Sequence, residues 1–122
     1  MVKRDIRDYL NGILTHTDLA QTFTKGMTFS EFEADDKTKL ALTRAVEIVG
    51  EAAKNVPQYI REQYLEIEWR DIVGMRNKIA HEYFGINFKI VWDTAHNNLP
   101  QLKPAIQSIL DELIANKDDS ES

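Results

Sequence analysis

The stretch LTRAVEIVGEAAKNVP, residues 42–57, decides the fold class, because its apolar residues recur at alternating steps of four and three. The recurring residues are Leu42, Val46, Val49, Ala53 and Val56. Such steps place these side chains on one face of an α-helix, and the proline that follows them cannot continue a helix. The pattern therefore predicts a long helix that packs lengthwise against its neighbours in a bundle and closes at Pro57.

Upstream of this helix, residues 2–23 also carry apolar side chains at helical spacing, and Lys25-Gly26 is expected to end that first helix. Ser30 and Glu33 then have the spacing of a capping box, in which each side chain satisfies the backbone N–H of the other residue. The pair Asp35-Asp36 is an alternative cap for the long helix, or otherwise complements its dipole.

Downstream, residues 58–68 show no clear period and are expected to form a helical turn and a connector. A further helix is expected from Trp69 to a stop at Gly85, and Asn87 should cap a last helical stretch. Pro100 must kink or restart that stretch, because proline has no N–H to donate. No strand-like alternation persists anywhere in the sequence. We therefore expect an all-α, up-down bundle of four or five helices.

Length and composition indicate one modest domain. The 122 residues are 43% hydrophobic, and we expect a single helical domain over residues 1–116 with a disordered acidic tail over 117–122. The sequence has no apolar run of about 20 residues and no cysteine, so a soluble, cytoplasmic protein without membrane contact is expected. The net charge of −5 argues against a protein that coats nucleic acid non-specifically.

The segment RNKIAHEYFG, residues 76–85, carries the side chains best suited to chemistry. Histidine can take a proton from a hydroxyl and return it to a leaving group near neutral pH, which suits His81 to acid–base catalysis. The guanidinium of Arg76 fits a phosphate and can stabilise charge on phosphorus, and Asn77 adds a neutral donor. Arg70, Arg76, Lys78 and Lys89 also give the region around this motif a cationic character. These are the parts of a metal-free ribonuclease in which the RNA 2′-hydroxyl attacks.

Helical geometry separates the members of this motif. Arg76 and Tyr83 are seven residues apart and fall within roughly 20° of one another around a helix, whereas His81 lies about 140° from Arg76. In one continuous helix Arg76 and His81 cannot act on the same substrate. Either the helix ends near His81, or a second subunit brings its copy across a two-fold axis.

An isolated Arg-x4-His spacing arises by chance in many helices, and a tyrosine such as Tyr83 is more often a core aromatic residue with a hydrogen-bonded hydroxyl than a reactive group. His16 and His96 have no acid or histidine at ligand spacing and are interpreted as structural or solvated. The sequence has no HExxH motif, no glycine-rich phosphate loop and no nucleophile elbow. We therefore expect no metal site and no nucleotide-binding fingerprint.

Three segments taken together change this balance: RAVEIVGEAAKNVP, EWRDIVGMRNKIAHEYFGIN and KIVWDTAHNNLPQLKPAI. In this order the chain resembles the HepT-type toxins of the HEPN superfamily, the toxins of type VII HepT/MntA toxin–antitoxin systems, from Asp5 to about Leu113. The resemblance implies a homodimeric HEPN-type helical bundle whose motif faces itself across the dimer cleft. It also implies that Arg76 and His81 are the catalytic pair of a metal-independent endoribonuclease, with Asn77 and Lys78 in support.

The same resemblance implies that Tyr83 accepts AMP from an antitoxin, a minimal nucleotidyltransferase of the MntA type. ATP and Mg²⁺ would belong to that partner, so no cofactor is expected for this chain. AMP on Tyr83 would add bulk and negative charge on the helix face shared with Arg76, and so repel RNA phosphate. Two alternatives stay open: a non-catalytic nucleotide- or substrate-binding companion of a nucleotidyltransferase, and a purely structural bundle.

Overall fold

The computed structural model describes residues 5–80 and 85–121, without the side chains of Arg76, Ala80 and residues 116–121. Helices make up most of these residues, and within the described ranges there is no β-strand, so the all-α prediction is confirmed. The elements are α1 (Ile6–Phe23), α2 (Phe29–Glu33), α3 (Asp36–Lys54), α4 (Gln58–Arg61), α5 (Trp69–Val73), α6 (Met75–Ala80), α7 (Phe88–Asp93), the π-helical turn η1 (Thr94–Asn98) and α8 (Leu99–Glu121).

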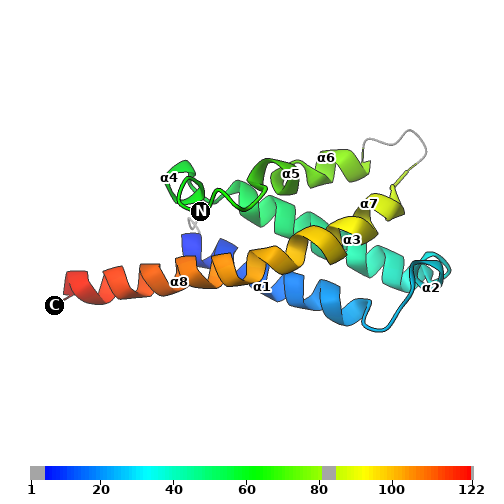
Figure 1. Ribbon diagram of the computed structural model, residues 1–122, viewed down its shortest axis with the longest axis horizontal. Coiled ribbons are helices and arrows are strands. Elements are labelled where there is room, and N and C mark those ends of the chain that lie inside the picture. Colours follow the sequence, from blue (N-terminus) through cyan, green and yellow to red (C-terminus); the bar gives the residue numbers. More distant parts are fainter. Residues whose placement is uncertain (1–4, 81–84, 122) are drawn as a thin grey trace.

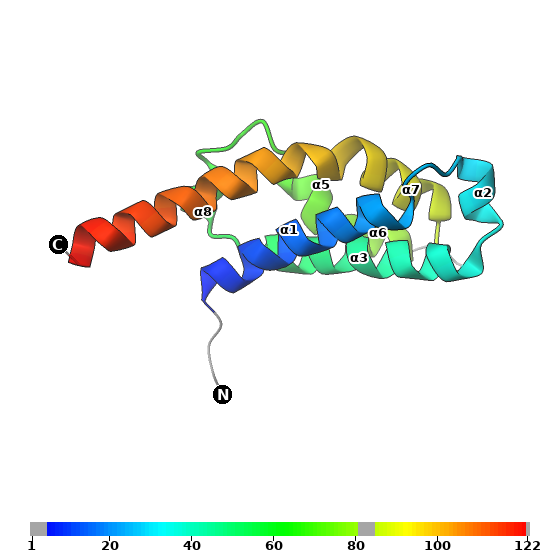
Figure 2. The ribbon, with the colours of Figure 1, turned by 90° about the horizontal axis from the view of Figure 1, so that it is seen from below.

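The main helical segments alternate in direction along one bundle, as the up-down prediction requires (Figure 1). Helix α1 and helix α3 lie antiparallel, and the short α2 connects them at one end of the bundle (Figures 1 and 2). Helices α5 and α6 return along α3. The run α7–η1–α8 then packs against α1 and α3. Helix α3 therefore occupies the middle of the bundle, with neighbours on more than one side.

Helix α3 buries a broad face. The predicted seam is confirmed, since each of its apolar residues is at most 2% exposed. Small residues beside the seam are also buried, and the seam did not predict them: Thr43 and Gly50 on one side, and Ala45 and Ala52 on the other. On the first side, Gly50 lets the backbone of α5 approach α3 closely.

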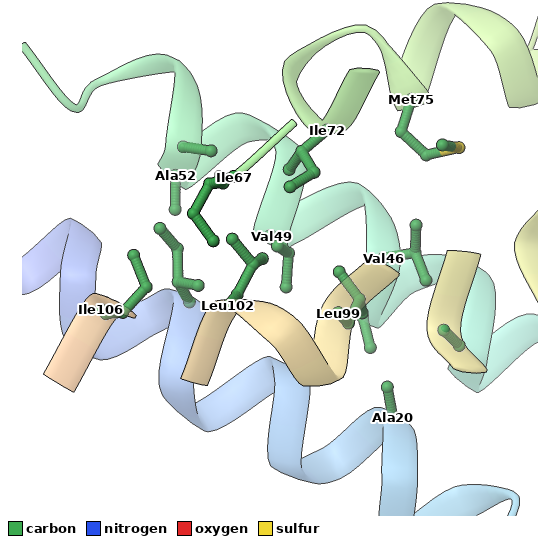
Figure 3. Packing of buried hydrophobic residues seen from close by; sticks show 14 of the residues in the cluster. Ala20, Val46, Val49, Ala52, Ile67, Ile72, Met75, Leu99, Leu102 and Ile106 are labelled. Atoms are coloured by element: carbon green, nitrogen blue, oxygen red, sulfur yellow. The ribbon is translucent and has the colours of Figure 1, made fainter. Parts of the chain in front are cut away.

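The core is continuous from α3 to the helices around it (Figure 3). Val46 and Val49 of α3 meet Leu99 and Leu102 of α8 there, and Ile72 reaches the same region from α5. Each of these side chains is at most 3% exposed. Burying one such side chain contributes about 1.5–3 kcal/mol relative to leaving it in water, so this contact region dominates the stability of the bundle.

The capping box lies two residues earlier than predicted. Thr28 Oγ1 accepts the backbone N–H of Glu31 (3.2 Å), and the Glu31 carboxylate accepts the backbone N–H of Thr28 (2.9 Å). The prediction of Ser30 and Glu33 was wrong because α2 begins at Phe29, so Thr28 is its N-cap and Ser30 already lies inside the helix. The alternative cap for the long helix is confirmed, since the Asp35 carboxylate accepts the backbone N–H of Thr38 (3.0 Å).

The helix predicted from Trp69 is interrupted at Gly74, which ends α5 before α6 begins. Just before this break, the end of α5 lies against Gly50 of α3. A Cβ placed on Gly50 would lie 2.9 Å from the backbone oxygen of Ile72, closer than real Cβ atoms approach other groups. The glycine at position 50 therefore lets the end of α5 rest directly on the backbone of α3, and this contact sets the position of α6.

The last helical stretch begins as predicted, with the Asn87 side chain accepting the backbone N–H of Ile90 (3.2 Å). The restart expected near Pro100 takes the form of η1, whose wider turn ends just before α8 starts at Leu99. Helix α8 continues through Glu121, so the backbone of most of the acidic segment 117–122 belongs to this helix. The division into a domain and a disordered tail at residue 116 stays a prediction.

Candidate active site

The predicted catalytic motif starts on α6, a short helix held against the bundle by two buried side chains. Met75 is 5% exposed and Ile79 is fully buried, and their spacing of four places both on one face. The Met75 sulfur accepts a hydrogen bond from Thr94 Oγ1 (3.2 Å), which ties the start of α6 to η1. Asn77 and Lys78, the two predicted supporting residues, are exposed. They are therefore accessible to a substrate or a second subunit.

The predicted catalytic and modification residues are described only in part. The backbone of Arg76 lies in α6, and His81 and Tyr83 lie outside the described residues. How Arg76 and His81 come together therefore stays a prediction. Gly85 has a φ of +124°, a backbone conformation that glycine adopts readily and other residues rarely do. The chain is thus non-helical at the glycine where the sequence predicts a stop.

A hollow of about 220 Å³ opens beside the motif, between α6 and the C-terminal half of α3. It is lined by Gly50, Glu51, Lys54, Val73, Gly74 and Asn77. Asn77 directly follows Arg76 in the sequence, so this hollow lies next to the position where α6 carries the predicted catalytic arginine. Lys54 is 22 residues before Arg76, so no local spacing in the sequence predicts that it lies near the motif.

A second hollow, of about 380 Å³, adjoins the first because Val73 and Gly74 line both. Its other lining residues come from α4, the connector and α5: Gln58, Arg61, Glu62, Leu65, Trp69 and Arg70. Trp69 is only 6% exposed, and its Nε1 donates a hydrogen bond to the backbone oxygen of Tyr64 (3.1 Å). The indole therefore forms a firm wall between the connector and α5.

Arg61 fixes the rim of this second hollow. Its Nε donates to the backbone oxygen of Val56 (2.9 Å), and its Nη2 donates to those of Ala53 (2.9 Å) and Lys54 (3.1 Å). Carbonyls at a helix C-terminus lack the usual donor four residues on, and the guanidinium supplies donors to three of them. The Ala53 oxygen also accepts the backbone N–H of Val56 (3.0 Å). The guanidinium also lies 5.9 Å from the centre of the Trp69 ring. Arg61 thus joins the end of α3 to α4 and α5.

Not all the cations of the predicted patch lie on the same helices. Arg70 and Lys78 are exposed on α5 and α6. Lys89 instead belongs to α7, where its Nζ pairs with the Asp93 carboxylate (3.1 Å) and lies 4.7 Å from the centre of the Phe29 ring. Lys54 of α3 takes a place near the motif that the local charge count did not identify.

The two described histidines have structural partners. His16 Nδ1 lies 2.8 Å from the backbone oxygen of Gly12, one helical turn earlier. His96 Nδ1 lies 2.8 Å from the backbone oxygen of Trp92, and its Nε2 lies 3.3 Å from Thr24 Oγ1. The His96 ring also stacks on Trp92, with ring centres 3.9 Å apart. The interpretation of both histidines as structural is consistent with these contacts.

The described residues contain neither a cluster of metal ligands nor a membrane-spanning helix. Across residues 5–80 and 85–121, no group of three or more histidine, aspartate or glutamate side chains is arranged to hold a metal ion. In the same part of the chain, no helix combines the length and the apolar character that crossing a membrane requires.

Comparison with known proteins places this helical arrangement in a family. The model of the family described as "Ribonuclease HepT-like" matches residues 13–109, which include the whole motif from Arg76 to Tyr83. A Methanocaldococcus jannaschii protein whose name marks it provisionally as an RNase is 40% identical over 113 residues, covering 93% of this chain and 97% of the relative.

Two further relatives agree. A Caldanaerobacter subterraneus protein, also named provisionally as an RNase, is 39% identical and covers 85% of this chain and 93% of its own length. A protein of Thermococcus cleftensis named as a probable ribonuclease HepT is 38% identical, covering 88% of this chain and 98% of its own. No solved structure matches the chain. Since the family model spans most of the sequence and the relatives align over nearly their full length, the chain belongs to the HepT-like ribonuclease family.

Proposed function

We propose that this chain is a metal-independent endoribonuclease and the toxin of a toxin–antitoxin pair. The observation that carries the proposal is the family match over residues 13–109, together with relatives named as ribonucleases. Arg76 and His81 lie within the matched range at the R-x4-H spacing. The exposure of Asn77 and Lys78 on α6 supports a substrate site at this end of the motif.

The proposed reaction uses the RNA's own nucleophile. His81 accepts the proton of a 2′-hydroxyl, and the 2′-oxygen forms a bond to the neighbouring phosphorus. The bond from phosphorus to the 5′-oxygen breaks, and that oxygen takes a proton from the imidazolium. Arg76 donates hydrogen bonds to the phosphate oxygens while negative charge builds on them. The products are a 2′,3′-cyclic phosphate and a 5′-hydroxyl, and DNA, which lacks the 2′-hydroxyl, is not cut.

We infer that the active unit is a homodimer. Around a continuous helix Arg76 and His81 point in directions about 140° apart, so a two-fold axis can supply the second residue from the other subunit. The inward-facing Met75 and Ile79 leave the opposite side of α6 free for such a contact. One composite site would then contain the motif of both subunits.

The proposed regulation is AMP transfer onto Tyr83 by an MntA-type nucleotidyltransferase. The tyrosine oxygen forms a bond to the α-phosphorus of ATP, pyrophosphate leaves, and the phenolic proton passes to a base. ATP and Mg²⁺ belong to the partner enzyme. The added phosphate can pair with Arg76 on the same helix face and repel the phosphates of RNA, which accounts for an inactive modified toxin.

The cleavage proposal is tested with purified chain, a single-stranded RNA and a chelator in the buffer. Arg76→Ala and His81→Ala should each lower the cleavage rate by about 10²- to 10⁴-fold, the usual contribution of such groups. Arg44→Ala, at an exposed arginine of α3, is the matched control and should cleave normally. Wild-type rates in His81→Ala would exclude this histidine as the acid–base group.

The regulation proposal is tested by incubating the chain with ATP, Mg²⁺ and the partner enzyme, followed by intact-mass measurement. Wild type should gain AMP-sized increments, and Tyr83→Phe should gain none. Increments that persist in Tyr83→Phe would place the acceptor elsewhere. Expression without the partner should slow growth in wild type and not in His81→Ala.

A further inference from the structure

The two hollows beside α6 adjoin one another at Val73 and Gly74, and together they are called the trough. The trough is defined by the lining residues of both hollows, from Asn77 at one end to Leu65 at the other, and it runs over Gly74, which lines both. At this shared border Gly74 has no side chain, and the side chain of Val73 is half-buried. The trough therefore begins one residue after Arg76 and extends away from the motif along α5.

The charge of the trough is opposite to that of the whole chain. Its lining includes the cations Lys54, Arg61 and Arg70 and the acids Glu51 and Glu62, which leaves a local charge of +1 on a protein of net charge −5. A positive hollow with low-dielectric walls attracts anions more strongly than its net charge suggests. The expected occupant is therefore anionic.

Two of these cations are available to a ligand. The guanidinium of Arg61 donates to three backbone oxygens at the end of α3, so it is already committed. Lys54 and Arg70 are exposed, and neither forms an ion pair with another residue in the described part of the chain. They lie in different parts of the trough, Lys54 beside Asn77 and Arg70 beyond Gly74. Such an arrangement suits a ligand with repeated negative charges.

We propose that the trough binds the single-stranded RNA on one side of the cut, with Lys54 and Arg70 each contacting a backbone phosphate. This proposal rests on the proposed function, because it places the flanking nucleotides next to the predicted catalytic residues. The apolar wall suits nucleobases: Leu65 is 79% exposed, and Trp69 and Val73 line the same part. Bases have an apolar face that such side chains can cover, whereas phosphates need the cations.

The test measures binding of a labelled single-stranded RNA to the His81→Ala chain, so that the probe is not cut. The double variant Lys54→Gln/Arg70→Gln keeps the aliphatic part of each side chain and removes two charges. It should bind about tenfold more weakly at low salt. Losing two phosphate contacts should also lower the slope of log affinity against log salt by about 1.4, at about 0.7 per contact for single strands.

The matched control is Lys37→Gln/Arg44→Gln, which removes the same two charge types from exposed positions on α3. Lys37 is 17 residues from Lys54, about 25 Å along the helix. The control should retain affinity and salt slope. Equal losses of RNA affinity in both double variants would show a general charge effect and refute RNA binding in the trough.

Two further outcomes separate this proposal from the proposed function. If the trough variant keeps its RNA affinity but changes the oligomeric state in sedimentation, the trough is an interface between copies and the RNA proposal is wrong. A second measurement uses Lys54→Gln/Arg70→Gln in a chain with His81 intact and RNA below saturation. If this variant cleaves RNA at the wild-type rate, RNA binding in the trough is refuted and the proposed nuclease activity is retained. If wild type neither binds nor cleaves RNA, the proposed function itself fails.

Discussion

The contact between Gly50 and the backbone of Ile72 gives the sharpest test of how α6 is positioned. In Gly50→Ala, the new Cβ would lie 2.9 Å from the Ile72 oxygen, whereas ordinary contacts begin at 3.4 Å. The difference, 3.4 minus 2.9, requires α3 and α5 to separate by about 0.5 Å, and neither atom belongs to a flexible side chain. Since only Val73 and Gly74 separate Ile72 from the start of α6, the displacement should reach the start of the motif.

The magnitude follows from two opposing effects. Replacing glycine by alanine inside a helix is favourable by about 0.8–1 kcal/mol, and overpacking a close contact costs about 1–3 kcal/mol. Gly12→Ala is the matched control, because Gly12 lies inside α1 and a Cβ there has nothing within 4 Å. The propensity gain cancels between the two variants. Gly50→Ala should therefore be less stable than Gly12→Ala by about 1–3 kcal/mol.

Thermal unfolding followed by circular dichroism measures this difference. For a chain of this size about 1 kcal/mol corresponds to roughly 3–5 °C, so the Tm of Gly50→Ala should lie about 3–15 °C below that of Gly12→Ala. RNA cleavage, measured well below both values of Tm, should fall in Gly50→Ala and not in Gly12→Ala. Equal Tm values in the two variants would refute the close contact, and unchanged cleavage would show that it does not position the motif.

Three other changes test the packing and the caps. Thr17→Val should raise the unfolding free energy by about 1–2 kcal/mol, because the fully buried Thr17 hydroxyl has no hydrogen-bond partner among the described residues. Thr43→Val is the control and should not raise it, because the Thr43 hydroxyl donates to a backbone oxygen at 2.7 Å. A denaturant titration measures both variants. Arg61→Lys should cost about 1–3 kcal/mol in the same titration, since a lysine cannot reach three carbonyls at once, and an unchanged midpoint would contradict that role. The backbone N–H of Thr38 lowers the pKa of Asp35, so this carboxylate contributes stability above about pH 3.9 that is lost as the pH falls through its folded pKa. Asp35→Asn keeps the cap without the titration, and its Tm should fall less than that of wild type on acidification; parallel curves would argue against this contribution.

Much of the helical arrangement could be predicted because it depends on local periodicity. The seam from Leu42 to Val56, the alternative cap at Asp35 and the cap at Asn87 are each readable within a few residues of sequence, and the structure confirms them. The capping box was misplaced because two overlapping Ser/Thr-x-x-Glu patterns compete there. The residue at which α2 starts, Phe29, decides for Thr28 over Ser30.

The break between α5 and α6 was missed for a different reason. A helix pattern through Trp69 and Ile79 continues across Gly74 without interruption, so periodicity alone favours one helix. The interior glycine of α3, Gly50, was the available signal, since a glycine inside a helix usually has a packing reason. Its partner, the backbone oxygen of Ile72, could not be identified from sequence, because backbone contacts between helices leave no side-chain pattern.

The sequence by itself determined the all-α class, the main helical segments and the identity of the motif residues, because these depend on residue types and on spacings of a few positions. The family match supports the assignment of the chain to the HepT-like ribonucleases. Only the tertiary structure decided that Lys54 of α3 lies beside Asn77 and that Arg70 of α5 lines the adjoining hollow. Residues far apart in the chain become neighbours through the packing of whole helices, and that packing depends on close backbone contacts such as the one at Gly50.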